Sequence, residues 1–131
     1  IDPVINEILT YVKGGLWQEP VKKQISVQGL KVLLYGKCDV IKENTIYDIK
    51  RVSKYEIGKY SNSVQHVLYL YCTDIPYFKY LISDGKSVWV EDYNLTKHTE
   101  NELKTIVSDF ICWLGTNNLL ETYKTNWKCK Y

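Results

Sequence analysis

The fold is expected to be organised around a hairpin at residues 32–52, whose sequence is VLLYGKCDVIKENTIYDIKRV. Two stretches of strand-forming residues flank a short polar segment at 42–45, which is typical of a hairpin turn. Counting outward from a two-residue loop places Asp39 directly opposite Asp48, and a four-residue loop gives the same register. Residues opposite each other on neighbouring strands share a face of the sheet, with Cβ atoms about 5 Å apart. The sequence therefore predicts two carboxylates side by side on one face.

Lysines accompany this predicted pair of carboxylates. Lys50 follows Asp48 by two residues and projects from the same face, and Lys37 is expected opposite Lys50. Two adjacent carboxylates repel each other unless a positive charge lies between them, and a divalent cation with oxygen ligands would supply that charge. The alternative is an exposed hairpin that carries ordinary charges on its solvent-facing side.

Length and composition predict one folded domain that spans residues 1–131. The chain is long enough to bury a core, and its 45% hydrophobic and 14% aromatic content excludes a disordered chain. Its apolar runs are much shorter than the ~20 residues that cross a bilayer, so we expect no membrane association. The chain begins at Ile1 and contains no methionine, and we therefore expect its natural N-terminus to be truncated.

The cysteines and the basic residues narrow the classes of function. The four cysteines form no C-x-x-C pair, which argues against zinc and iron–sulfur sites and favours reduced thiols in a cytoplasmic protein. The net charge of +2 neither demands nor excludes a nucleic-acid partner. All but one of the 17 basic residues are lysines, which suit phosphate contact better than bidentate reading of bases.

Further helices and strands are predicted on both sides of the hairpin. One helix is expected to begin at Asp2-Pro3 and to end at Gly14-Gly15, and another to open with a capping box at Thr99. The remaining expected elements are a strand at 21–27, a helix at 62–72, a second hairpin with strands at 77–83 and 87–92, and a short helix at 119–127.

Short polar motifs recur along the central hairpin and the helix that follows it. They are, in order, Gly36-x-x-Asp39, Asp48-x-Lys50 and Gln65-x-x-x-Tyr69. This order resembles the PD-(D/E)XK nuclease superfamily, specifically its RecB-like and phage-exonuclease branch, over roughly residues 15–92. The resemblance implies an α/β fold in which helices flank a mixed central sheet of four to five strands, a restriction-endonuclease-like core.

The resemblance also assigns the ligands of a metal centre. Asp39 and Asp48 would bind Mg²⁺, for which Mn²⁺ would substitute, and the backbone carbonyl of Ile49 would complete the site. Many relatives carry Glu at the position of Asp48, and the family pattern permits either acid. An upstream acidic residue usually adds to such sites. Glu19 is the candidate for this ligand here, and Glu7 is the alternative.

Other residues receive roles in catalysis or DNA binding from the same resemblance. Lys50 would hold the attacking water or offset charge in the transition state, and Gln65 and Tyr69 would position the substrate or support the metal. His66 is a further candidate for a direct role. The predicted catalytic residues are Glu19, Asp39, Asp48, Lys50 and Gln65. The predicted DNA-binding residues are Lys37, Arg51, Lys54, Tyr55, Lys59, Tyr60 and Tyr69.

The activity implied by the resemblance is Mg²⁺-dependent hydrolysis of phosphodiester bonds in DNA. We expect an exonuclease that acts in the replication or recombination of a phage or mobile element, because the small domain shows no extra sequence-reading motif such as a helix-turn-helix. The alternatives are a structure-selective endonuclease of the same fold and a non-catalytic protein that binds nucleic acid or scaffolds a partner. DNA is the expected partner, and association into a homo-oligomer or with a replication or recombination protein is left open.

Overall fold

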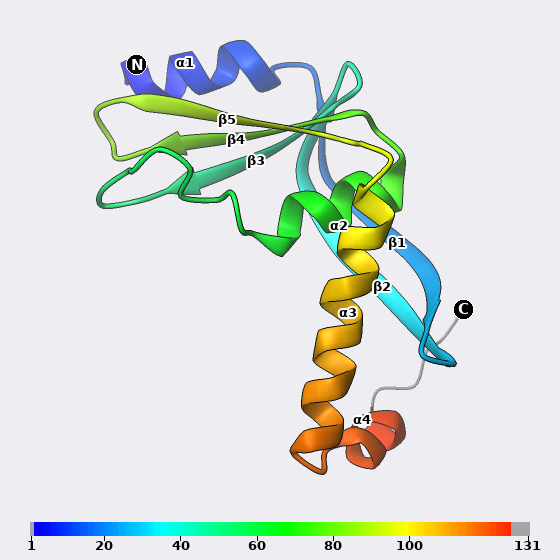
Figure 1. Cartoon of the computed structure of the whole chain (residues 1–131). Helices are drawn as coiled ribbons and strands as arrows, with labels where there is room; N and C mark the ends of the chain where they lie inside the picture. The colour runs from blue at the N-terminus through cyan, green and yellow to red at the C-terminus, as the bar shows by residue number, and fades with distance from the viewer. Residues whose placement is uncertain (1, 127–131) are drawn as a thin grey trace.

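The computed structural model describes residues 2–126 and consists of a five-stranded sheet with helices on both faces (Figure 1). The elements follow the chain as α1 (Pro3–Val12), β1 (Leu16–Val27), β2 (Leu30–Lys42), β3 (Thr45–Arg51), α2 (Val64–Thr73), β4 (Tyr77–Ser83), β5 (Val88–Asn94), α3 (Thr99–Thr116) and α4 (Leu120–Asn126). The predicted α/β fold with a mixed sheet is confirmed. Trp127, expected in the last helix, lies outside the described residues. None of the described helices is long and apolar enough to cross a membrane.

The strands lie in the sheet in the order in which they occur along the chain. β2 is antiparallel to β1 and to β3, β3 and β4 are parallel, and β5 is antiparallel to β4. A parallel pair needs a crossover connection over one face of the sheet. The crossover between β3 and β4 contains α2, which therefore covers one face next to these two strands.

Side chains of β3 alternate between two layers of the core. Ile46 packs with Leu70 of α2, whereas Tyr47 packs with Val12 of α1 on the opposite side of the sheet. Because Asp48 follows Ile46 by two residues, its side chain points to the face that α2 covers. The predicted acidic site therefore lies between the sheet and α2, and α1 lies on the other side.

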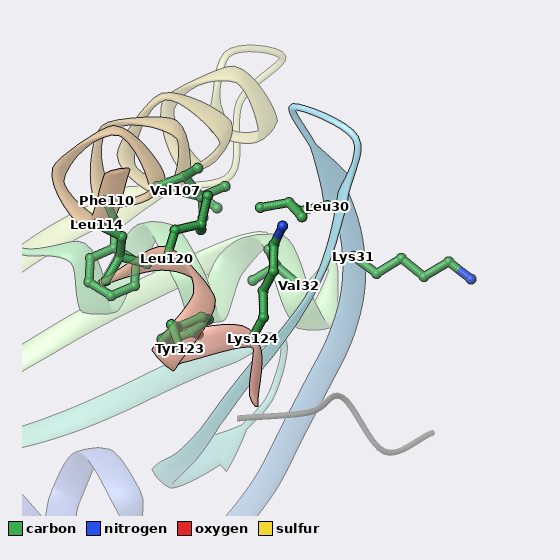
Figure 2. A pocket seen from close by; sticks show the side chains of 10 residues that line it. Leu30, Lys31, Val32, Val107, Phe110, Leu114, Leu120, Tyr123 and Lys124 are labelled. Atoms are coloured by element: carbon green, nitrogen blue, oxygen red, sulfur yellow. The ribbon is translucent and has the colours of Figure 1, made fainter. Parts of the chain in front are cut away.

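The hairpin of β1 and β2 extends beyond the other strands, and its far end packs against α3 (Figure 1). Ile25 and Leu34 of the hairpin meet Leu103 and Val107 of α3 in this part of the core. An apolar cavity of about 260 Å³ lies between the hairpin, α3 and α4 (Figure 2). Aliphatic and aromatic side chains form most of its wall, and no acidic side chain of the described residues lines it. This cavity is therefore separate from the predicted acidic site.

The turn between β2 and β3 has the predicted register, but the pairing beyond it is shorter than predicted. Lys42 pairs with Thr45, and the two turn residues 43–44 have φ angles of 49° and 60°, as in a tight hairpin turn. Pairing between the two strands ends at Val40 and Tyr47. The two strands therefore separate just before the predicted acidic pair is reached.

This separation corrects the prediction that Lys37 lies opposite Lys50. Lys37 pairs instead with Pro20 of β1, because β2 follows β1 after it leaves β3. β1 begins at Leu16 rather than at residue 21, since a proline is tolerated in a strand at the edge of a sheet. The capping box was also predicted wrongly: the Thr99 hydroxyl accepts a hydrogen bond from the Thr96 N–H, and α3 begins without a side-chain cap.

α2 lies directly against β2 at Gly36. A Cβ atom on Gly36 would lie 2.2 Å from Cε1 of Tyr69, closer than two carbon atoms can approach. The Tyr69 hydroxyl donates a hydrogen bond to the Lys37 carbonyl at 3.1 Å and accepts one from the Lys37 N–H at 3.3 Å. Gly36 therefore permits the close approach through which α2 binds the backbone of β2.

Gly36→Ala is expected to lower the free energy of unfolding by about 1–3 kcal/mol, because the Tyr69 ring must move to admit the methyl group. Urea denaturation measures the change. Gly115→Ala in α3 is the control: its added Cβ meets nothing within 4 Å, so the helix should gain up to about 1 kcal/mol. In a Tyr69→Ala background the cost of Gly36→Ala should disappear. A cost that persists there would contradict this account of Gly36.

Candidate metal centre

The site begins where β2 separates from β3, at Asp39. Oδ2 of Asp39 accepts a hydrogen bond from the Ile49 N–H at 2.9 Å. The carboxylate thus binds a backbone group of β3 beyond the last residue pair that the two strands form. Gln18 of β1, whose φ of 56° marks a distortion of that strand, donates from Nε2 to Oδ1 of Asp39 at 3.4 Å. Asp39 is therefore held from both neighbouring strands.

Asp48 is almost fully buried, with 3% of its surface exposed. Its Oδ1 accepts a hydrogen bond from Nε2 of Gln65 at 2.9 Å. Its Oδ2 lies 3.0 Å from Nζ of Lys50, the distance of an ion pair, but no donor of the described residues is directed at it as a hydrogen bond. The charge on Oδ2 of Asp48 is thus balanced by the ammonium of Lys50, but this oxygen has fewer hydrogen-bond donors around it than a buried carboxylate oxygen usually has.

Burial raises the pKa of Asp48 to about 6, although Lys50 lowers it and Asp39 adds to the increase. The N–H that donates to Asp39 belongs to Ile49, the residue after Asp48, so the two acids are close although β2 and β3 no longer pair at this point. Two acids close together in a low-dielectric site favour a bound cation, or else a proton on one of them. Asp48 is therefore the member of the pair that the fold holds at the highest electrostatic cost.

Gln65 and Tyr69 hold the site from α2. Gln65 lies in the first turn of the helix, where its N–H is bonded by the side chain of Ser63, and its amide reaches Asp48. Tyr69 is buried, and its hydroxyl is bonded to the backbone of Lys37. The predicted supporting role of Tyr69 agrees with this position. The prediction that Tyr69 contacts DNA does not, because its ring is packed over Gly36 inside the protein.

The two predicted upstream acids, Glu19 and Glu7, lie on different elements, and only Glu19 is on a strand next to Asp39. Glu19 is on β1 opposite Cys38, whose pKa is raised to about 12 by burial, by Asp39 and Asp48, and to a smaller extent by Glu19. Glu7 is on α1, across the sheet from Asp48, and is excluded as a ligand by this position. Among the described residues, no three side chains of Asp, Glu, His or Cys are grouped as metal ligands. Glu19 is therefore not grouped with Asp39 and Asp48 as a third ligand, and its role in binding the metal stays a prediction.

His66 belongs to the core and not to the site. It is buried, its Nδ1 lies 2.9 Å from the Tyr80 hydroxyl, and its ring stacks on Tyr93 with centroids 3.9 Å apart. Burial lowers the pKa of His66, so the neutral imidazole is favoured. Of the two neighbouring candidates on α2, Gln65 therefore faces the site and His66 does not.

The predicted DNA-binding residues divide into two sets. Lys37 of β2, Arg51 at the end of β3, and Lys54 and Lys59 of the loop that follows are all exposed. The two loop tyrosines are half-buried: Tyr55 stacks on Trp89 at 4.9 Å between centroids, and Tyr60 stacks on Tyr80 at 4.8 Å. The lysines and Arg51 are free to meet a phosphate backbone, whereas the two tyrosine rings are already covered on one face.

Glu91 is a buried acid beside the site that sequence reasoning missed. Its carboxylate accepts hydrogen bonds from the Tyr55 hydroxyl at 2.6 Å, the Tyr93 hydroxyl at 2.7 Å and the Tyr60 N–H at 3.2 Å. Burial alone would raise the pKa of Glu91, but these bonds outweigh it and leave the pKa below its ordinary value. The alternation of Trp89, Glu91 and Tyr93 was the available signal, because it places the acid on an aromatic face.

The donor set at Asp39 and Asp48 fits a hard divalent cation. Both ligand groups are carboxylates, and the Ile49 backbone lies in the same gap. The Oδ2 atom of Asp48 is paired with the ammonium of Lys50 and has no other donor among the described residues. The thiol of Cys38 lies nearby, but its raised pKa keeps it protonated and unsuited to bind a metal. The arrangement is therefore that of an oxygen-ligand site beside a lysine.

Comparison with known proteins identifies the fold. No family model matches the sequence, and no curated protein matches it. A solved structure, the crystal structure of SSO0001, is similar, with a TM-score of 0.68 and 15% sequence identity over 83% of this chain. The chain spans 55% of the length of that protein. At this identity the similarity establishes a shared fold only.

Asp48→Asn is expected to stabilise the metal-free protein at about pH 7.5 by about 2 kcal/mol. The folded-state pKa of about 6 lies above the ordinary value of 3.8, so the folded protein binds this proton more tightly than the unfolded chain. The ionised carboxylate therefore opposes folding fully above about pH 6, and the advantage of the variant should nearly vanish by about pH 4. Thermal unfolding at a series of pH values in EDTA measures the difference.

The matched control for this measurement is Asp109→Asn, which changes an exposed acid on α3. It should leave the midpoint of unfolding nearly unchanged at every pH. A variant Asp48→Asn that is less stable than the parent at about pH 7.5 would show that Lys50 and Gln65 compensate the charge fully.

Proposed function

We propose that the chain is a Mg²⁺-dependent DNA nuclease of the PD-(D/E)XK type, an exonuclease that acts in the replication or recombination of a phage or mobile element. The observation that carries the proposal is the pairing of Asp48 with Asp39 and Lys50. Asp48 is buried, and among the described residues its Oδ2 atom has no polar partner besides the ammonium of Lys50, 3.0 Å away. A purely structural acid would be expected to complete its hydrogen bonds, as Glu91 does.

A divalent cation bound by Asp39, Asp48 and the Ile49 carbonyl would supply Lewis acidity and a hydroxide at neutral pH. The chain's own residues orient the metal ligands and offset the charge that develops in the reaction. Gln65 fixes the orientation of the Asp48 carboxylate through Oδ1 and leaves Oδ2 toward Lys50. Lys50 is about one-third exposed, so its ammonium can reach a phosphate oxygen and offset the charge that develops there.

The surroundings of the site suit a DNA backbone. The exposed side chains of Lys54 and Lys59 lie on the loop whose Tyr60 is next to Lys50, and Lys37 and Arg51 add exposed positive charge on β2 and β3. The net charge of the chain is still too small to bind every polyanion. Lysines contact phosphates as point charges and carry little information on base sequence. This composition supports a nuclease that acts on the backbone, and it agrees with an exonuclease better than with a sequence-specific endonuclease.

The proposal predicts metal-dependent cleavage of linear DNA that requires the three central residues. Asp39→Ala, Asp48→Ala and Lys50→Ala should each lower the rate by about a hundredfold or more, because each removes a charge from the reacting centre. The measurement is the release of labelled nucleotides in Mg²⁺, in Mn²⁺ and in EDTA. Lys104→Ala, which changes a lysine of α3 paired with Glu100, is the control and should cut at the parent rate.

Cutting that survives both Asp48→Ala and Lys50→Ala would disprove the assignment of the site. DNA that is retained without cutting, with or without metal, would favour the non-catalytic alternative. Cleavage of a covalently closed circle at a rate comparable to that of linear DNA would favour an endonuclease over an exonuclease.

The metal site itself predicts a change in stability that does not depend on activity. Mg²⁺ or Mn²⁺ at about 100 times its dissociation constant should raise the free energy of unfolding by about 2.7 kcal/mol, because the ion binds only the folded chain. Thermal unfolding with and without the ion measures this effect. Asp39→Asn and Asp48→Asn should abolish it, and Asp109→Asn should retain it. Equal stabilisation of all four proteins would place the ion elsewhere.

A further inference from the structure

The loop between β3 and α2, residues 52–63, holds an apolar side chain out into solvent beside the candidate metal centre. Ile57 is 97% exposed, the highest value among the large hydrophobic residues that the structure describes. Exposed lysines stand on both sides of it, Lys54 before and Lys59 after. A single exposed hydrophobic residue is ordinary on a protein surface, but Ile57 belongs to a loop that is held in a defined position.

The loop is anchored on both sides of Ile57. Tyr55, two residues before it, donates a hydrogen bond to Glu91 and stacks on Trp89. Tyr60, three residues after it, bonds to Glu91 through its N–H and stacks on Tyr80. A buried carboxylate and two aromatic stacks therefore fix the ends of the segment, and the exposure of Ile57 is a property of a positioned loop.

The anchored segment surrounds an open hollow of about 510 Å³. Its wall is formed by Ser53, Lys54, Glu56, Ile57, Gly58 and Lys59. Two ammonium groups, a hydroxyl and an aliphatic side chain together match the chemistry of a nucleotide, which combines an anionic phosphate with a flat apolar base. Glu56 lies 3.8 Å from Lys54, but both side chains are exposed, and such a pair is weak enough to exchange for a phosphate.

The loop that forms the hollow is next to the candidate metal centre at Tyr60. The ammonium of Lys50 lies 5.8 Å from the centroid of the Tyr60 ring, which anchors the loop, and 3.0 Å from Oδ2 of Asp48. A DNA strand that places a phosphate at Lys50 therefore meets this loop within the neighbouring nucleotides.

On the basis of the nuclease function proposed above, we propose that the 52–63 loop selects DNA whose end carries an unpaired base. Ile57 packs against the face of that base, and Lys54 and Lys59 bind the flanking phosphates. Stacked neighbours cover both faces of paired bases inside a duplex and one face of the last pair, whereas an unpaired or frayed base at an end can turn a face toward the loop. Tyr55 and Tyr60, which sequence reasoning assigned to this contact, instead hold the loop in place.

The test measures binding in EDTA, where no cleavage occurs, with 2-aminopurine at the end of a labelled oligonucleotide. Ile57→Ala should weaken binding to a duplex with a short single-stranded end about fivefold, since it removes three apolar carbons from the contact. It should also reduce the change in 2-aminopurine fluorescence at saturation. Binding to a relaxed, covalently closed circular duplex, which has neither ends nor unpaired loops, should be unchanged. Ile5→Ala, which changes a half-exposed isoleucine on α1, is the matched control and should behave as the parent.

The two lysines give a second, separate readout. Lys54→Ala and Lys59→Ala should weaken binding to open and closed DNA alike, and each should reduce the dependence of log affinity on log salt by about one. Ile57→Ala should leave that slope unchanged.

Equal binding and equal fluorescence for the parent and Ile57→Ala would overturn the loop proposal, and it would leave the nuclease assignment intact if Asp48→Ala still abolishes cutting. Conversely, a selective loss of end binding in Ile57→Ala, in a protein that cuts no DNA, would support the loop contact and remove the nuclease.

Discussion

The separation of β2 from β3 is the constraint on which the candidate site depends. Two strands that part leave backbone groups without ladder partners, and such groups must find other partners or lose stability. Asp39 supplies one partner to the Ile49 N–H, and the Tyr69 hydroxyl supplies two to Lys37. The gap is thus stabilised by side chains from β2 and α2. It gives a buried acid on β3 access to whatever enters between the strands.

Glu91 and Asp48 are buried carboxylates on the same face of the sheet, and they differ in the number of hydrogen bonds that stabilise their charge. Glu91 accepts three hydrogen bonds, its pKa is lowered, and it holds a loop against the sheet. Asp48 accepts one hydrogen bond and faces one ammonium, and its pKa is raised to about 6. A carboxylate left incompletely satisfied in this way destabilises the folded chain at neutral pH, and perturbed acids of this kind concentrate at functional sites. The contrast within one molecule supports a structural role for Glu91 and a chemical role for Asp48.

Local sequence patterns predicted most of the secondary structure, because turns and periodicity act over a few residues. The Glu43-Asn44 turn has the predicted register as far as Val40 and Tyr47, and beyond it Asp39 reaches β3 by accepting a hydrogen bond from the Ile49 N–H and not as the paired neighbour of Asp48. The end of the β2–β3 pairing could not be predicted, since it depends on contacts of Gly36 with Tyr69, far along the chain. Glu91 and Ile57 were missed for the same reason. The role of an acid in a strand or of an isoleucine in a loop depends on aromatic residues that come together only in the folded chain.

The position of the loop follows from the topology of the sheet. β3 and β4 are parallel, so the chain that leaves β3 must cross one face of the sheet before β4 begins. The side chains of Asp48 and Lys50 point to that same face, and the crossover must therefore pass over or beside them. A crossover that covered these residues would block the site, whereas an unanchored one would leave its position undefined. The bonds from Glu91 on β5 hold the loop to the side of Lys50. Glu91 on β5, three strands away from Asp39 on β2 in the sheet order, thus anchors the loop beside the candidate site.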